Sequence, residues 1–118
     1  DKATKRSLQM VRPDVVVRII AAGAYYDREG VVEAVDSSRK CTVRLPELGI
    51  TVTLIEQGLR ILAPKAGDRA IVLSGEFEGR RGKVTSIYAD DNECVLTLDG
   101  GGSEMEFISL DRVGKLAA

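Results

Sequence analysis

The 118-residue sequence contains no histidine and no tryptophan, and it has only two cysteines. Without histidine the chain lacks the usual general base and the commonest metal ligand. Cys41 and Cys94 both lie inside apolar, strand-like runs, which favours buried, reduced thiols over a disulfide framework or a zinc site. We therefore expect a protein that is not an enzyme, with no catalytic residues, no metal site and no cofactor.

Long apolar runs and a strong net charge are also missing. No run approaches the roughly 20 residues that a membrane helix needs, and no apolar signal segment begins the chain. The formal net charge is −1, which argues against a wholly basic surface for nucleic acid. Residues 1–62 hold 10 Lys+Arg and 8 Asp+Glu, giving +2, whereas residues 63–118 hold 7 and 10, giving −3. Any anion-binding surface must therefore be a local patch.

Short runs of Val, Ile and Leu between turn residues predict an all-β fold. The expected strands cover residues 15–20, 30–35, 41–45, 50–55, 59–62, 69–73, 82–87, 94–98, 104–108 and 112–116. The second five strands repeat the first five at an interval of 52 or 53 residues. Five short strands in such a span are typical of a small SH3-like barrel. The sequence thus predicts two five-stranded SH3-like barrels in tandem.

The expected domain boundaries follow from this repeat. Residues 1–12 form a flexible arm or short helix, 13–62 the first barrel, 63–67 a linker and 68–118 the second barrel. The short linker favours barrels that pack together, and two independent beads are the alternative. Because the chain starts with Asp rather than Met, we expect it to be a fragment of a longer protein.

A glycine-punctuated stretch, residues 67–87, resembles the KOW motif of ribosomal proteins and NusG/Spt5 transcription factors. Gly75, Gly79 and Gly82 are the residues that mark it. A second resemblance covers nearly the whole chain. Residues 8–9, 12–20, 61–64, 72–75 and 114–117 resemble the C-terminal region of the eukaryotic Kin ("Kin-seventeen") DNA/RNA-binding protein family.

This resemblance implies tandem SH3-like domains, the second with the KOW motif, in a nuclear protein of DNA replication, DNA repair and RNA processing. It also implies RNA binding and anion binding by lysines. One of these lysines matches Lys115. The other lies in a lysine-rich run of the family that reads Asp27-Arg28-Glu29 here, where only Arg28 is positively charged.

Basic and aromatic side chains are the candidate binding residues. Arg80, Arg81 and Lys83 flank the tightest expected turn and are either phosphate contacts or a solvated charge cluster. The full set of candidates for nucleic-acid or anion binding is Lys115, Arg80, Arg81, Lys83, Arg28, Arg112 and Lys65. Lys65 and Arg112 are the two weaker candidates for lining a groove between packed barrels. Phe77 and Tyr26 are candidates for stacking on a base, although Phe77 is equally suited to capping its own barrel.

Two functions remain open. The first is an RNA- or DNA-binding module of a nuclear protein, which contacts the phosphate backbone through a local basic surface in a salt-sensitive way. The alternative is a protein–protein interaction module that docks peptides of a replication, repair or splicing complex. In either case we expect a monomer that does not contact membranes.

Overall fold

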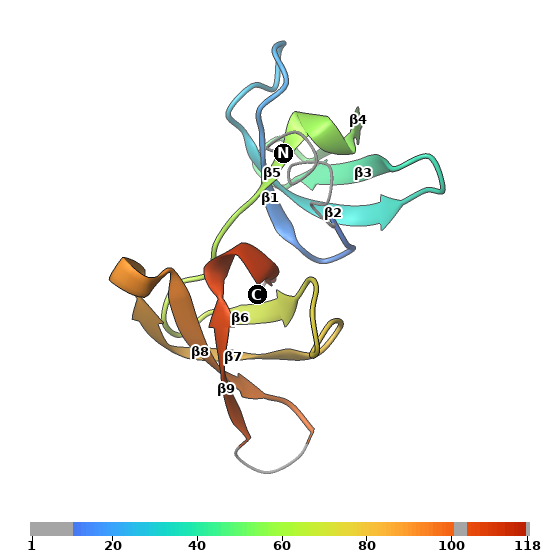
Figure 1. The fold of residues 1–118 in the computed structure, drawn as a ribbon. Coiled ribbons are helices and arrows are strands. Elements are labelled where there is room, and N and C mark those ends of the chain that lie inside the picture. Colours follow the sequence, from blue (N-terminus) through green and yellow to red (C-terminus); the bar gives the residue numbers. More distant parts are fainter. Residues whose placement is uncertain (1–10, 101–103, 118) are drawn as a thin grey trace, which may run out of the picture. The chain divides into compact units, whose positions relative to one another are not determined.

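The computed structural model describes residues 11–100 and 104–117, and in this part of the chain all regular elements are β-strands or short 3₁₀ turns (Figure 1). Most of the arm expected over residues 1–12 lies outside the described residues. No helix in the described part is long and apolar enough to cross a membrane. The chain divides into two compact units, which we call unit 1 (Asp1–Ile61) and unit 2 (Leu62–Ala118).

Each unit is one five-stranded antiparallel sheet. In unit 1 the elements are β1 (Val16–Ile19), β2 (Glu29–Val35), β3 (Lys40–Leu45), β4 (Ile50–Ile55), the turn η1 (Glu56–Gly58) and β5 (Leu59–Ile61), in the sheet order β4-β3-β2-β1-β5. In unit 2 they are β6 (Arg69–Val72), β7 (Arg81–Tyr88), η2 (Ala89–Asp91), β8 (Glu93–Leu98), β9 (Met105–Ser109), η3 (Leu110–Arg112) and β10 (Val113–Lys115), in the order β10-β6-β7-β8-β9. The predicted all-β fold with two small barrel-like domains is confirmed. Packing of the barrels against each other stays a prediction.

Alternation of apolar and polar residues places one face of each strand in a core. In β3, Cys41, Val43 and Leu45 are all buried, as their spacing predicts. The core of unit 2 is built from Ala70, Val72, Val84, Cys94, Leu96, Leu98, Ile108 and Val113. Both thiols are free and fully buried, and burial raises the pKa of each.

The internal repeat extends to irregular features of the backbone. A β-bulge interrupts the β2–β3 pairing between Val32 and Ala34, and another interrupts β7–β8 between Val84 and Ser86. Each of these hairpins also turns through a left-handed residue, Arg39 in unit 1 (φ 64°) and Asn92 in unit 2 (φ 54°). The two units therefore share even the positions at which the pairing of their strands is interrupted.

Three glycines of the KOW-like stretch have different roles. Gly75 and Gly79 have φ angles of 96° and 87°, so they make the turn in a region that L side chains rarely adopt. Gly82 instead lies inside β7, where a Cβ would collide with the carbonyl oxygen of Thr97 on β8. Gly30 plays the same part in unit 1, since its Cβ would lie 2.8 Å from the carbonyl oxygen of Arg44. Both sheets depend on this close approach of two strands.

We predict that Gly82→Ala destabilises unit 2. The added methyl group meets backbone rather than a flexible side chain, so β7 and β8 must separate, at a cost of about 1–3 kcal/mol. Urea unfolding followed by circular dichroism measures the loss, and amide hydrogen exchange assigns it to β7 and β8. Ser86→Ala, in the same strand, is the control and should have little effect. Equal stability of the two variants would contradict the prediction.

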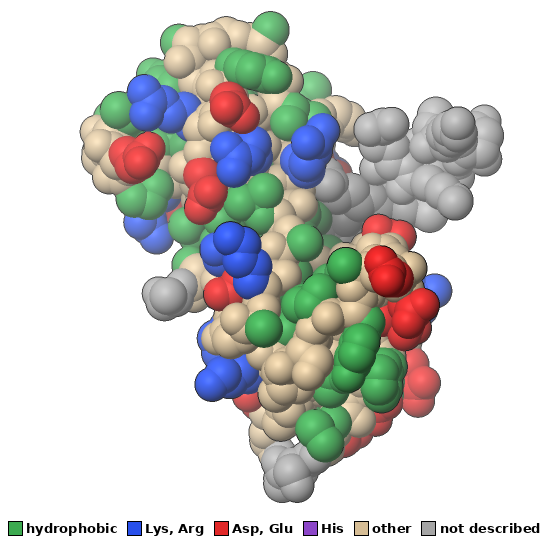
Figure 2. Space-filling view, turned by 90° about the vertical axis from the view of Figure 1, so that its left-hand side faces the viewer, with side chains coloured by type: hydrophobic (Ala, Val, Ile, Leu, Met, Phe, Trp, Pro, Cys, Tyr) green, Lys and Arg blue, Asp and Glu red, His purple; other side chains and the backbone are tan. Residues whose placement is uncertain are grey.

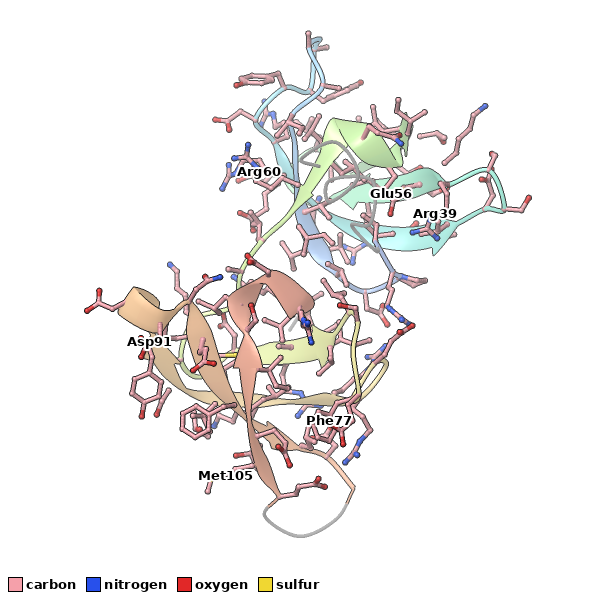
Figure 3. The ribbon with its side chains drawn as sticks, in the orientation of Figure 1. Arg39, Glu56, Arg60, Phe77, Asp91 and Met105 are labelled. Atoms are coloured by element: carbon pink, nitrogen blue, oxygen red, sulfur yellow. The ribbon has the colours of Figure 1, made fainter. Side chains whose placement is uncertain are left out.

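In unit 1, Arg39 and Glu56 form a partly buried ion pair (Figure 3). Glu56 is 7% exposed, and its carboxylate accepts hydrogen bonds from Arg39 Nη2 (2.6 Å) and from the backbone N–H of Val11 (2.9 Å). Arg39 Nη2 also donates to the carbonyl oxygen of Val11 (3.0 Å). Desolvation raises the pKa of Glu56, but these hydrogen bonds outweigh it, so the pKa lies below its usual value.

We predict that Glu56→Gln lowers the free energy of unfolding by about 1–2 kcal/mol at pH 7. Because the folded-state pKa is depressed, the stabilisation is present above the unfolded-state pKa of about 4.3 and is lost as the pH falls through the folded-state value. The stabilities of the parent and the variant should therefore converge below about pH 4. Glu47→Gln, which alters an exposed carboxylate, is the control. A difference that persists unchanged at about pH 3 would show that the charge of Glu56 is not its cause.

Candidate nucleic-acid interface

The loop between β6 and β7 is held by its own backbone. Val72 N–H donates to Arg80 O (2.9 Å), Gly79 N–H donates to Val72 O (2.8 Å), and Arg80 N–H donates to Phe77 O (2.9 Å). Phe77 folds back and packs against the core of unit 2. This packing is what the capping alternative requires, and stacking of Phe77 on a base stays a prediction.

The corresponding loop of unit 1 has the same hydrogen bonds with a different sequence. Ile19 N–H donates to Arg28 O (2.8 Å), Asp27 N–H donates to Ile19 O (2.8 Å), and Arg28 N–H donates to Tyr25 O (3.1 Å). Asp27 adopts the positive φ (69°) that Gly79 supplies in unit 2. Tyr25 is half-buried, whereas Tyr26, the candidate for stacking, is 61% exposed.

This equivalence puts Arg28 and Arg80 at the same place in the two units, and each faces a carboxylate. Arg28 Nη1 lies 3.5 Å from Glu47 Oε1, and Arg80 Nη2 lies 3.4 Å from Glu104 Oε1. Both pairs are exposed, and exposed pairs contribute only about 0–1 kcal/mol to stability. Either arginine can therefore exchange its carboxylate for another anion at little cost.

The outer side of the β6–β7 hairpin gathers further cations. Arg69 pairs directly with Lys83 in the strand register, and Arg81 lies two residues before Lys83 on the same side of β7. We call Arg69, Arg80, Arg81 and Lys83 the basic face of unit 2. All four are exposed or half-buried. Arg69 was not among the predicted site residues, although alternation along the hairpin places it opposite Lys83.

Asp99 lies against this basic face and partly neutralises it. Its two carboxylate oxygens accept hydrogen bonds from Nη1 (2.8 Å) and Nη2 of Arg69, and its backbone oxygen lies 3.4 Å from Arg80 Nη2. The hydrogen bonding to Arg69 lowers the pKa of Asp99, and the charges of Arg69 and Arg81 lower it further. Asp99 and Glu104 thus lie against Arg69 and Arg80, whereas no ion pair joins Lys83 to another described residue.

The other predicted residues lie elsewhere in their units. Lys115 Nζ lies 3.9 Å from Asp68 Oδ2, the oxygen that accepts a hydrogen bond from the backbone N–H of Lys65. Asp68 therefore contacts the ammonium group of Lys115 and the backbone of Lys65. The Arg112 guanidinium lies beside Gly75 at the loop. A shared groove that includes Arg28 of unit 1 stays a prediction.

We predict that Arg69→Gln returns the pKa of Asp99 toward the ordinary aspartate value of about 3.9, because the variant removes the bidentate hydrogen bonding and the positive charge. Carbon-13 NMR titration of the carboxyl group measures this rise. Asp36 is the matched control in unit 1, since its pKa is lowered by the backbone N–H of Lys40 and by Ser38 and not by an arginine. If the pKa of Asp99 stayed unchanged, the pairing with Arg69 would be wrong.

In comparisons with known proteins, this chain matches one protein family and several individual proteins. Residues 66–96 match the KOW motif family. The DNA/RNA-binding protein KIN17 of Mus musculus is 28% identical over 98% of this chain, and that of Homo sapiens is 25% identical over the same share. The human G-patch domain and KOW motifs-containing protein is 35% identical over 73% of this chain, which amounts to 19% of that protein. The chain spans 31% of the length of the two KIN17 relatives.

These matches confirm the KOW motif in unit 2 and the resemblance to the Kin-seventeen family, and they are consistent with the C-terminal KOW region of that family.

Proposed function

We propose that this chain, which resembles the KIN17 family over nearly all of its length, is a nucleic-acid-binding module that holds phosphate groups of RNA or DNA on the basic face of unit 2. The observation that carries the proposal is the cross-strand pairing of Arg69 with Lys83, with Arg80 and Arg81 beside them on the KOW-like hairpin. The name of the KIN17 relatives, DNA/RNA-binding protein, supports the same ligand class.

In this proposal binding is an exchange of anions. A phosphate displaces Asp99 or Glu104 from exposed pairs with Arg69 and Arg80, while Lys83 contributes a cation that needs no displacement. Arginine suits this role because its planar fork can donate two hydrogen bonds to one phosphate. Contacts of this kind do not depend on the nucleotide sequence. Salt weakens them because binding releases counterions from the phosphates. The net charge of −1 limits the affinity to what this local face provides.

The loop backbone supplies a second element of the proposal. Gly79 is exposed, has a positive φ, and would have no heavy atom within 4 Å of an added Cβ, so a sugar–phosphate chain can approach the loop closely. Arg80 and Arg81 follow directly. An arginine next to such an open turn is well placed to hold the backbone of a single-stranded nucleic acid.

For the whole protein we propose a non-enzymatic, nuclear role in DNA replication, DNA repair and RNA processing. This part of the proposal is supported by the family resemblance alone. Localisation of the tagged full-length protein in cells tests it, and a protein confined to the cytoplasm would contradict it.

We predict that a fluorescein-labelled single-stranded RNA binds at low salt and that its affinity falls steeply toward physiological salt. The double variant Arg81→Gln/Lys83→Gln should bind more weakly, and the slope of log K against log salt should fall by about 0.7 for each phosphate that the variant no longer neutralises. Asp99→Asn should strengthen binding, because it releases Arg69 from its carboxylate partner. A double-stranded DNA of equal charge, titrated in parallel, distinguishes between the two nucleic acids.

Arg44→Gln is the matched control, since it removes an exposed arginine from unit 1 that pairs with Glu33 (3.1 Å). It should leave the affinity and the salt slope nearly unchanged. Absence of binding to both RNA and DNA at low salt would refute the proposed function. An equal loss of affinity in the control and the double variant would refute the assignment to the basic face.

A further inference from the structure

The opposite end of the unit 2 sheet carries an exposed apolar patch. Tyr88, Met105 and Phe107 are 45%, 60% and 66% exposed. The rings of Tyr88 and Phe107 stack with their centroids 5.9 Å apart and their planes at 25°. Val95 pairs directly with Phe107 in the β8–β9 register and is 8% exposed. We call these four residues the β9 patch.

The β9 patch lies on the outer side of the sheet. Cys94, Leu96 and Ile108 belong to the core of unit 2, so alternation directs the neighbouring Val95 and Phe107 to the other side. Val95 is thus buried on the outer side of the sheet, without being part of the core cluster. A solvent-facing side of a small barrel has no need of such a cluster for its own folding.

The internal repeat offers a direct comparison for the β9 patch. Unit 1 has the same bulge, and its equivalent positions follow from the strand pairing, since Thr42 pairs with Thr53 as Val95 pairs with Phe107. In place of Tyr88, Val95, Met105 and Phe107 it has Asp36, Thr42, Thr51 and Thr53. The same fold therefore forms with polar residues at all four positions. The apolar residues of unit 2 are therefore not dictated by the fold that the two units share.

Strand β9 also presents an unpaired edge. It is the last strand of the sheet, and in the described residues it pairs only with β8. Leu98 N–H donates to Glu104 O (2.9 Å) and Leu110 N–H donates to Asn92 O (2.9 Å). Because hydrogen-bonded pairs recur at every second residue of an antiparallel ladder, the even-numbered residues of this stretch direct their backbone groups toward β8. The odd-numbered residues direct theirs outward.

Met105 and Phe107 therefore combine two features. Their backbone groups face the open edge, and their side chains lie on the exposed apolar patch. An extended peptide that adds to this edge would gain main-chain hydrogen bonds and apolar contacts from the same two residues.

The charges around the patch indicate the charge of a peptide that would bind there. No Lys or Arg occurs between Lys83 and Arg112, and the acidic residues next to the patch are Glu93 and, in η2 directly after Tyr88, Asp90 and Asp91. Glu93 pairs with Tyr88 across the β7–β8 ladder. Figure 2 shows hydrophobic side chains of unit 2 bordered by acidic ones, and Figure 3 shows Met105 and Asp91 pointing away from the sheet. Phosphates would be repelled here, whereas lysines and arginines would be attracted.

We propose that the β9 patch is a docking site for a basic peptide segment with alternating apolar side chains, which binds in an extended conformation along the edge of β9. Its apolar residues contact Phe107 and Met105, and its cations meet the surrounding carboxylates. The site is separate from the basic face and does not depend on the proposed nucleic-acid binding.

The test uses a fluorescein-labelled peptide of about nine residues that alternates lysine with leucine or valine. Phe107→Thr, which installs the residue found at the equivalent position of unit 1, should weaken binding by about tenfold. Tyr26→Ala removes another exposed aromatic, from unit 1, and should leave the affinity unchanged. A peptide with glutamate in place of lysine should not bind, and Asp91→Asn/Glu93→Gln should reduce the salt dependence of binding.

Amide hydrogen exchange distinguishes the addition of a strand from non-specific adsorption to the apolar patch. Bound peptide should protect the amides of Met105 and Phe107, whose N–H groups face the open edge, and should add little at Glu106 and Ile108, which already pair with β8. The proposal is overturned if Phe107→Thr binds the peptide as tightly as the parent does. It is also overturned if single-stranded RNA, rather than the peptide, protects β9, or if the patch is covered by a second copy of the chain, seen as a dimer that Phe107→Thr dissociates.

Discussion

The contact between a glycine and a neighbouring backbone is the constraint on which both units depend. Gly30 and Gly82 let β2 and β7 approach the next strand so closely that no side chain fits between them. The bulge that follows each glycine increases the local twist, and this combination bends a five-stranded sheet into a small barrel. Once the strands are bent in this way, alternation alone decides which side chains enter the core and which form the outer face.

Most of the fold could be predicted from the sequence because it depends on local patterns. The strands follow from alternating Val, Ile and Leu, and the tandem arrangement follows from the repeat. The Arg39–Glu56–Val11 contact could not be predicted, since it joins residues far apart in the chain and Glu56 resembles any other charged turn residue. Asp27 likewise gives no sign in the sequence that it adopts the backbone conformation of a glycine.

The candidate site was predictable in part for the same reason. Arg80, Arg81 and Lys83 are adjacent in the sequence, whereas the contributions of Arg69 and Asp99 arise from pairing across strands. Unit 2, although acidic as a whole, separates its charges: the cations lie on β6, the start of β7 and the region around β10, and the carboxylates lie mostly around η2, β8 and β9. Net charge therefore conceals two surfaces of opposite charge, for which we propose phosphates and basic chains as the respective ligands.

Tandem copies of one fold face a hazard during folding, because a segment of one copy can seat itself in the other. The turn that carries Glu56 corresponds to the turn that carries Leu110, and the position of Arg39 corresponds to that of Asn92. A unit 1 turn seated in unit 2 would bury a carboxylate with no guanidinium to meet it, which costs several kcal/mol. The Arg39–Glu56 ion pair thus makes this turn fit its own unit better than it would fit the other.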